Sequence, residues 1–364
     1  MHLPPLDVAV YPVVTMNHGR YVSRSARASS AVSSVSSSSS VSSPTCAPTV
    51  NFSGIQRAIQ SVFRSSKVTV QQAERLQGRL HQVYLAKVAD GSIYVLKCPP
   101  HLSTRALRHE KHGLETSYKT LRYLRDYLQG QLPVPEVYQY KEHVGVLGSP
   151  YLLMTCVPGR KLSEMLPYLS PGERGSIDRT LGTYVQSISS LNAQRFGMTH
   201  NVFANKGSRS WREAFQRLLE SALRDCEEML VTLPYDSIRY YIERHLPALD
   251  QVQTPYMVAM DMCDPDNVLV DEQTKQITGL VGFSNVIWGD PLMNAGIANG
   301  SDAFFEGYGE RPSGTGAPYA RQLIYAIYRA IVQIASLYYR PRPRLSDNDA
   351  RRSLTHAVNT LATL

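Results

Sequence analysis

Hydrophobic and polar residues alternate in the segment from residue 68 to residue 97. The pattern is clear in Gln82–Val88 and returns in Ile93–Lys97, and Asp90-Gly91 between them is typical of a hairpin turn. A period of two places successive side chains on opposite faces of a strand. The segment therefore predicts an antiparallel β-hairpin.

A helical spacing follows over residues 103–129. Its apolar positions are Leu107, Leu114, Tyr118, Leu121 and Leu124. Residues at intervals of three, four and seven share one face of a helix, so one long amphipathic helix is expected at about 104–128. Pro133-Val134-Pro135 ends this pattern, and the apolar runs Val137–Tyr140 and Tyr151–Val157 predict further strands.

Helical patterns dominate the chain after residue 162. They cover Ile177–Leu191, Trp211–Leu230, Ser237–Leu249 and Tyr319–Tyr338. One β-like stretch interrupts them, in which Val258–Val270 and Ile277–Val281 flank the turn Asp271–Lys275. This order predicts an α+β protein with two lobes: a small antiparallel, β-rich N-lobe at 51–157 and a larger helical C-lobe at 158–364.

The first 50 residues have a different composition. Thirteen serines lie between Ser23 and Ser43, and such a segment buries too little apolar surface to offset the entropy of ordering it. A disordered leader is expected at 1–50. Its arginines, serines and scarcity of acidic residues leave a mitochondrial transit peptide open as the alternative.

The charge balance is basic, with 38 Lys and Arg against 30 Asp and Glu. The charges are diffuse and form no stripe with interleaved aromatic residues, so we expect anionic small molecules rather than nucleic acid as partners. No window holds 18 uninterrupted apolar residues, so no membrane partner is expected. The five cysteines are scattered and lack zinc-site spacing, which predicts free thiols and a cytoplasmic location.

Six short motifs follow one another between residues 96 and 308. They are Leu96-Lys97, Val134-Pro135-Glu136-Val137, Tyr151–Met154 followed by Pro158-Gly159, Asp266–Asp271, Trp288–Pro291 and Phe305–Tyr308. Together they resemble the aminoglycoside phosphotransferase family, which has a protein-kinase-like fold. The resemblance covers everything except the leader, and it implies ATP and Mg²⁺ as cofactors and a small molecule as substrate.

The resemblance assigns nucleotide-binding roles in the N-lobe. Lys97 matches the strand lysine that contacts the phosphates, and Glu110 is the expected acidic partner that holds it. Gly78 lies in the turn that covers the phosphates. Met154 to Val157 match the hinge whose backbone pairs with the base.

The catalytic loop departs from the family pattern of His-Gly-Asp, four residues and Asn. Counting back from Asn267, the position of the catalytic aspartate is Met262, which cannot accept a proton. Asp261 and Asp264 are the remaining candidates for a base. Because side chains alternate along an extended segment, a shift of one residue turns Asp261 to the opposite face from Met262.

The metal site departs from the pattern as well. The family's metal-binding aspartate corresponds to Gly282, which leaves Asn267 as the only family metal ligand, and Asp290 in Gly-Asp-Pro is expected to be structural. Two missing carboxylates predict a catalytically impaired, pseudokinase-like protein that acts by binding a nucleotide, a small ligand or a protein partner. The alternative is an active ATP-dependent phosphotransferase that uses Asp261 or Asp264 as its base.

Overall fold

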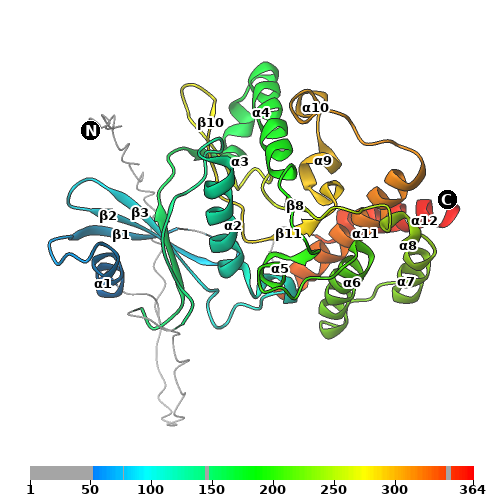
Figure 1. Cartoon of the computed structure of the whole chain (residues 1–364), viewed down its shortest axis with the longest axis horizontal. Coiled ribbons are helices and arrows are strands. Elements are labelled where there is room, and N and C mark those ends of the chain that lie inside the picture. The colour runs from blue at the N-terminus through cyan, green and yellow to red at the C-terminus, as the bar shows by residue number, and fades with distance from the viewer. Residues whose placement is uncertain (1–51, 77, 144–146, 342–345) are drawn as a thin grey trace, which may run out of the picture. The chain divides into compact units, whose positions relative to one another are not determined.

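A five-stranded antiparallel sheet forms the N-lobe (Figure 1). The computed structural model describes residues 52–76, 78–143, 147–341 and 346–364, all within the compact unit Cys46–Leu364. The disorder predicted for residues 1–50 concerns residues outside these ranges. The strands are β1 (Val70–Leu76), β2 (Gln82–Val88), β3 (Ile93–Cys98), β4 (Val137–Lys141) and β5 (Tyr151–Thr155), in the spatial order β1-β2-β3-β5-β4.

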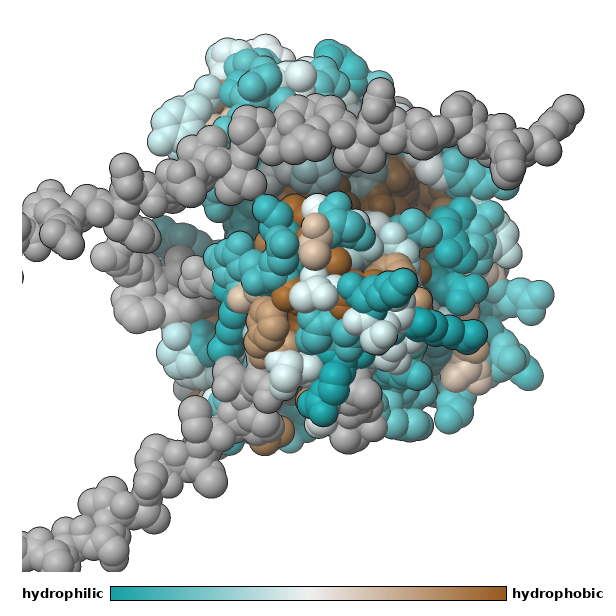
Figure 2. Space-filling view, turned by 90° about the vertical axis from the view of Figure 1, so that its left-hand side faces the viewer, coloured by the Kyte–Doolittle hydropathy of each residue, from teal (hydrophilic) through white to brown (hydrophobic). Residues whose placement is uncertain are grey.

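The predicted hairpin is confirmed, because β2 and β3 pair in antiparallel register with Leu85 opposite Val95. Helix α1 (Phe52–Phe63), which the sequence reading did not anticipate, packs on this part of the sheet. Its buried Ile55 and Ile59 join a core with β2, β3 and β5 residues. The visible part of the face formed by α1 and the neighbouring strands is mainly hydrophilic, with small hydrophobic areas (Figure 2).

Helix α2 (Gly113–Leu128) contacts β4 and β5 and shares a core with Leu152. The predicted helix start at about residue 104 was wrong by nine residues. Leu107 instead belongs to the core of the C-lobe, and the Arg108 backbone N–H donates to the Asp225 carboxylate (3.0 Å). These tertiary contacts hold residues 99–107 out of the helix, and only a short 3₁₀ turn, η1 (Arg108–Glu110), precedes α2.

The C-lobe is mainly helical. Its helices are α3 (Leu162–Met165), α4 (Pro171–Ser189), α5 (Thr199–Phe203), α6 (Trp211–Glu228), α7 (Tyr235–Arg244), α8 (Leu246–Leu249), α9 (Ala295–Asn299), α10 (Asp302–Tyr308), α11 (Gly316–Tyr339) and α12 (Asn348–Thr363), with 3₁₀ turns η2 (Leu166–Tyr168) and η3 (Pro291–Met293). The four helical patterns read from the sequence are all present, and α11 packs against α6 and α12.

Two small sheets interrupt these helices. One has the order β10-β9-β6 and the other the order β7-β11-β8. Their strands are β6 (Arg160–Lys161), β7 (Gly197–Met198), β8 (Tyr256–Ala259), β9 (Val268–Val270), β10 (Ile277–Leu280) and β11 (Val286–Gly289). The β-like stretch predicted at Val258–Val270 is thus two strands, and the loop 260–267 between them carries the predicted catalytic residues.

The structure therefore confirms the α+β class, with an antiparallel sheet in the smaller part and helices in the larger. The lobe boundary at residue 157 stays a prediction. Within the described residues, no helix has the length and apolar character needed to cross a membrane.

Candidate active site

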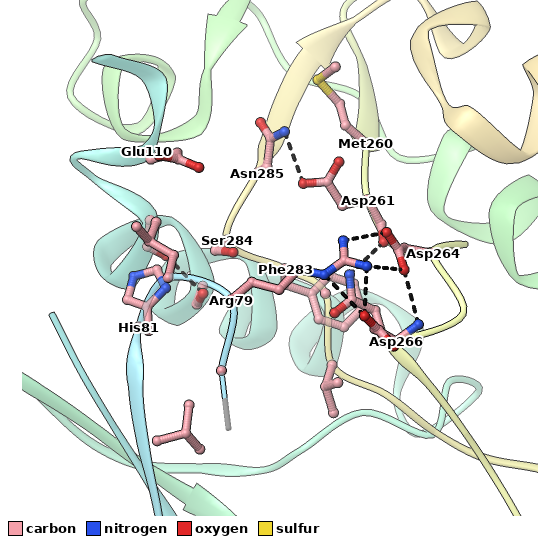
Figure 3. A pocket seen from close by; sticks show the side chains of 18 of the residues that line it. Arg79, His81, Glu110, Met260, Asp261, Asp264, Asp266, Phe283, Ser284 and Asn285 are labelled. Carbon is pink, nitrogen blue, oxygen red and sulfur yellow. Dashed lines mark hydrogen bonds and ion pairs between the residues drawn. The ribbon is translucent and has the colours of Figure 1, made fainter. Parts of the chain in front are cut away.

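A cavity of about 1030 Å³ lies between the N-lobe sheet and the C-lobe loops that follow β8 and β10. It is lined by β2 and β3, by the segment that follows β5, by the loop 260–267 and by one face of α11. The site residues predicted from the sequence line it, with the exception of Met262: Gly78, Lys97, Glu110, Met154, Val157, Asp261, Asp264, Asn267 and Gly282. Figure 3 shows part of this cavity.

Lys97 lies on β3 and points its ammonium group toward α2. Its Nζ donates a hydrogen bond to the Ser117 hydroxyl (3.3 Å). Burial lowers the pKa of Lys97 to about 8. In the described part of the chain no carboxylate forms an ion pair with it, so Lys97 is a half-buried cation with only a neutral partner.

Glu110 does not pair with Lys97, and that expectation was wrong. Its carboxylate receives two hydrogen bonds from Arg340 (2.6 and 2.8 Å), a residue at the end of α11. It also accepts from the Leu107 backbone N–H (2.7 Å). Because the helix begins three residues after Glu110, its side chain faces the C-lobe.

The turn between β1 and β2 contains Gly78 and Arg79. A Cβ at Gly78 would lie 2.5 Å from the His81 carbonyl oxygen, so this close approach of the backbone requires glycine. Arg79 reaches across the cleft and binds Asp264 (2.5 Å) and Asp266 (2.7 Å), as Figure 3 shows. The pKa of Asp266 is lowered by a hydrogen bond from the Ser163 hydroxyl and by Arg79.

Met262 and Asp261 face opposite sides of the catalytic loop. Met262 is fully buried in the core shared with Val268 and Phe283, whereas Asp261 opens into the cleft. The Asp261 carboxylate accepts a hydrogen bond from Asn285 Nδ2 (3.1 Å; Figure 3). Although the Asp261 side chain is exposed to the cleft, the protein atoms packed around it raise the pKa of its carboxyl group despite the opposing hydrogen bond.

Of the two candidate bases, Asp264 is held by Arg79 while Asp261 forms no ion pair within the described residues. The Asn267 amide donates to the Asp261 backbone carbonyl (2.8 Å), which fixes the loop around that residue. The Asp261 side chain is therefore the carboxylate available to a proton donor in the cleft.

The family metal position offers no ligand. A Cβ at Gly282 would lie 2.6 Å from Asn267 Nδ2 and 2.9 Å from Asn267 Cβ, so the asparagine occupies the space that an aspartate would need. No group of three or more His, Cys, Asp and Glu side chains suited to a metal occurs among the described residues. The residues present do not fit the magnesium site that the family implies.

The hinge carries an unused backbone donor. Thr155 N–H donates to the Glu136 carbonyl (2.9 Å) and Cys156 N–H to the Ile93 carbonyl (3.2 Å). The N–H of Val157 has no such acceptor in the described part of the chain. Met154 is buried near the end of β5, and both it and Val157 line the cleft.

Asp290 lies outside the cleft lining, as the structural role expected from the sequence requires. It is buried and accepts hydrogen bonds from Arg321 (2.8 Å), Tyr325 (2.8 Å) and the Leu292 backbone (3.1 Å). Burial raises the pKa of its carboxyl group, and the Arg321 charge opposes that effect. These contacts join η3 to α11.

The sequence model of the phosphotransferase enzyme family matches residues 72–323, more than half of the chain. The chain belongs to this family. Family membership and the shared fold confirm the resemblance read from the motifs. The match also spans the whole cleft-forming part of the N-lobe sheet and the loop 260–267.

Solved structures of this family are similar over most of the chain. A candidate fructosamine-3-kinase from Haemophilus somnus 129PT has a TM-score of 0.62 at 15% identity and covers 84% of this chain and 96% of its own. A candidate aminoglycoside phosphotransferase from Ralstonia eutropha JMP134 has a TM-score of 0.58 at 14% identity, covering 86% and 97%. An aminoglycoside phosphotransferase in complex with GDP and kanamycin has a TM-score of 0.54 at 14% identity, covering 85% and 97%. These likenesses establish the kinase-like fold.

A curated mouse protein, acyl-CoA dehydrogenase family member 10, is 22% identical over 222 residues. The aligned part is 59% of this chain and 19% of the mouse protein. The chain thus spans about a fifth of the length of that relative.

Two cleft residues, Arg79 and Arg329, were missed by the sequence reading. Arg79 directly follows the glycine of the phosphate-covering turn, and a cation at that place was a usable signal. Arg329 interrupts the most apolar helix of the chain, which was a second signal. Ser117 stands where the spacing to Leu121, Leu124 and the Pro-Val-Pro turn places the helix glutamate of the family. Its hydroxyl also donates to the Gly113 carbonyl (2.8 Å).

Proposed function

We propose that this chain binds a nucleotide in the cleft and transfers its phosphoryl group far more slowly than a family member with both carboxylates. The observation that carries the proposal is Lys97, a half-buried cation that lines the cleft without an anionic partner in the described chain. A nucleotide phosphate supplies the missing negative charge. Gly78 and the free N–H of Val157 would contact the phosphates and the base.

The slow rate follows from two positions. Gly282 brings no carboxylate to the phosphates and is packed against Asn267, and Met262 is buried in the core. Electrostatic stabilisation of the transferred group is usually the largest contribution to catalysis, and the chain lacks the aspartate that would help to supply it. We propose that the chain acts by binding a small ligand. If it is a pseudokinase, a protein is the alternative partner.

A second function, an active ATP-dependent phosphotransferase, is favoured by the orientation of Asp261. Its carboxylate opens into the cleft, and burial raises its pKa, as suits a general base. Asp261 would take the proton of the acceptor hydroxyl. The hydroxyl oxygen would then bond to the γ-phosphorus as the bond between that phosphorus and the ADP oxygen breaks. Similar structures bound to GDP and kanamycin support a nucleotide and a small acceptor.

We also propose a cytoplasmic location, with the mitochondrial alternative retained. The four described cysteines, Cys98, Cys156, Cys226 and Cys263, are all free, which suits a reducing compartment.

Thermal unfolding with ATP tests the nucleotide proposal, because a ligand that binds only the native state raises the Tm. ATP at a few millimolar should raise the Tm with or without magnesium, and Lys97→Met should abolish the shift. An equal shift in both proteins, or none in the wild type, contradicts the proposal. Transfer of labelled phosphate to water or sugars should be undetectable; rapid transfer that Asp261→Asn abolishes would establish the second function instead.

A further inference from the structure

One face of α11 forms the C-lobe wall of the cavity and is polar. The residues of this face are Tyr328, Arg329, Val332, Gln333, Ser336, Leu337 and Arg340. Arg329, Gln333, Ser336 and Arg340 follow one another at spacings of four, three and four, which aligns them along one side of the helix. We call these four residues the α11 polar stripe.

The two ends of the α11 polar stripe differ in their partners. Arg340 is neutralised by Glu110 and also bonds to the Ser336 hydroxyl (3.2 Å). Arg329 has no counterpart: its Nη1 is shielded from solvent and unbonded, and its guanidinium forms no hydrogen bond or ion pair within the described chain. Burial lowers the pKa of Arg329 to about 10, with no carboxylate opposing the effect.

Two other partly buried arginines, Arg321 and Arg108, have carboxylate partners. Arg321, two turns earlier on α11, is paired with Asp290, and Arg108 beside η1 is paired with Asp225. An unpaired guanidinium that has lost much of its hydration is unfavourable, and the fold gains nothing from it that an apolar side chain would not provide. Arg329 is therefore suited to a negative charge that comes from outside the chain.

Arg329 and Lys97 line the same cavity from different lobes, Lys97 from β3 of the N-lobe and Arg329 from α11 of the C-lobe. Lys97 acts on His81 in the N-lobe: burial and the Lys97 charge together lower the pKa of His81 well below its usual range. Arg329 instead follows Tyr328, whose pKa is raised by burial and by the nearby charge of Asp261. Asp261 thus lies between the α11 wall and the Arg79–Asp264 contact, whose charges also act on it.

We propose that the small ligand of this cleft is an organic anion, a hydroxylated carboxylic acid, whose carboxylate binds Arg329 and whose hydroxyl groups reach Gln333 and Asp261. This proposal deepens the proposed function and rests on it for the role of the cleft. It sets this chain apart from relatives whose structures hold the aminoglycosides gentamicin and kanamycin. Gln333 is exposed and has no side-chain partner in the described chain, so its amide is available.

Three probes of equal size and different charge test the ligand class: gluconate, glucose and glucosamine, each at about 50 mM and equal ionic strength. The Tm of the full chain is measured with each probe and, separately, with ATP. Gluconate should raise the Tm of the wild type more than glucose or glucosamine does. Arg329→Gln should remove this preference, with a loss of at least tenfold in gluconate affinity by calorimetry, and should leave the ATP shift unchanged.

The matched control is Arg174→Gln, which removes an exposed, unpaired arginine of α4 outside the cavity and should keep the preference. Equal shifts with all three probes, or no shift with any, overturn the proposal. The proposal is also overturned if Arg329→Gln loses the Tm shift with ATP together with the Tm shift with gluconate, because Arg329 would then bind the nucleotide. A gluconate preference without any ATP shift supports the anion site and refutes nucleotide binding.

A second variant guards against a merely structural role. Arg329→Met removes the unpaired charge, so the ligand-free Tm should rise above that of the wild type while gluconate protection is lost. A fall in the ligand-free Tm would mean that the guanidinium stabilises the fold, and it would overturn the proposal.

Discussion

The ammonium of Lys97 contacts the hydroxyl of Ser117, 3.3 Å away, at the point where the family pattern places a carboxylate. A hydroxyl accepts the hydrogen bond but does not neutralise the charge. Burial disfavours the charged form of Lys97 in the folded state, no carboxylate among the described residues offsets that effect, and its pKa falls to about 8 from an ordinary value of 10.5. This one pair explains both the nucleotide proposal and a measurable pH dependence of stability.

The first prediction concerns that pH dependence. When folding lowers the pKa of a lysine, the charged side chain destabilises the folded state by its full amount at pH values below the pKa of the folded state. This destabilisation disappears as the pH rises to the pKa of the unfolded state. The stability of the wild type relative to Lys97→Met should rise by about 3 kcal/mol between pH 7 and pH 10.5, with most of the rise above pH 8. Urea unfolding from pH 6 to 10.5 measures it.

Lys87→Met, on the adjacent strand β2, is the control for the loss of a lysine. A constant difference between wild type and Lys97→Met over the whole pH range would contradict the prediction.

The second prediction concerns Arg79, which Asp264 and Asp266 hold across the cleft. These carboxylates compete with nucleotide phosphates for the guanidinium. The double variant Asp264→Asn/Asp266→Asn should therefore bind ATP about three- to tenfold more tightly, a change of roughly 1 kcal/mol. Calorimetric titration with ATP measures the gain.

The Arg79→Gln background separates this competition from a general loss of negative charge. In that background the double variant should bind ATP hardly more tightly than Arg79→Gln alone does. Arg75→Gln on β1 is the control for removing an arginine from the same hairpin. An undiminished gain in Arg79→Gln would show that Arg79 takes no part.

The third prediction concerns Met262, the position of the family's catalytic aspartate. Met262→Asp would bury a carboxylate among Val268 and Phe283 without a partner, so it should destabilise the protein by about 3–5 kcal/mol and restore no activity. Met262→Leu should cost less than about 1.5 kcal/mol. Unfolding curves of both variants test this, and a stable Met262→Asp protein with new phosphoryl transfer would refute it.

The fourth prediction concerns Gly282 and Asn267, because the Asn267 side chain occupies the space that a side chain at position 282 would need. Gly282→Ala should destabilise the protein by about 1–3 kcal/mol, because the new methyl group meets the asparagine side chain. In an Asn267→Gly background the same substitution should cost much less. Additive effects in this double-mutant cycle would show that the two positions do not interact.

The sequence by itself determined the local elements and their order. Alternation in Gln82–Val88 and Ile93–Lys97 specified two strands, because side chains of a strand point to its two faces by turns. The helical period at Tyr319–Tyr338 specified α11 in the same way. The order of the motifs also identified the family and located the loop 260–267, while the loss of two family carboxylates at Met262 and Gly282 stays a prediction.

The tertiary structure decided which of these residues meet. Helical spacing favoured Glu110 as the partner of Lys97, but the helix begins at Gly113 and Arg340, 230 positions further along the chain, holds that carboxylate. Alternation in the loop predicted that Asp261 and Met262 face opposite ways, and only packing against the core decided that Asp261 takes the cleft. Ion pairs and burial depend on contacts between distant segments, whereas periodicity reports only on neighbours along the chain.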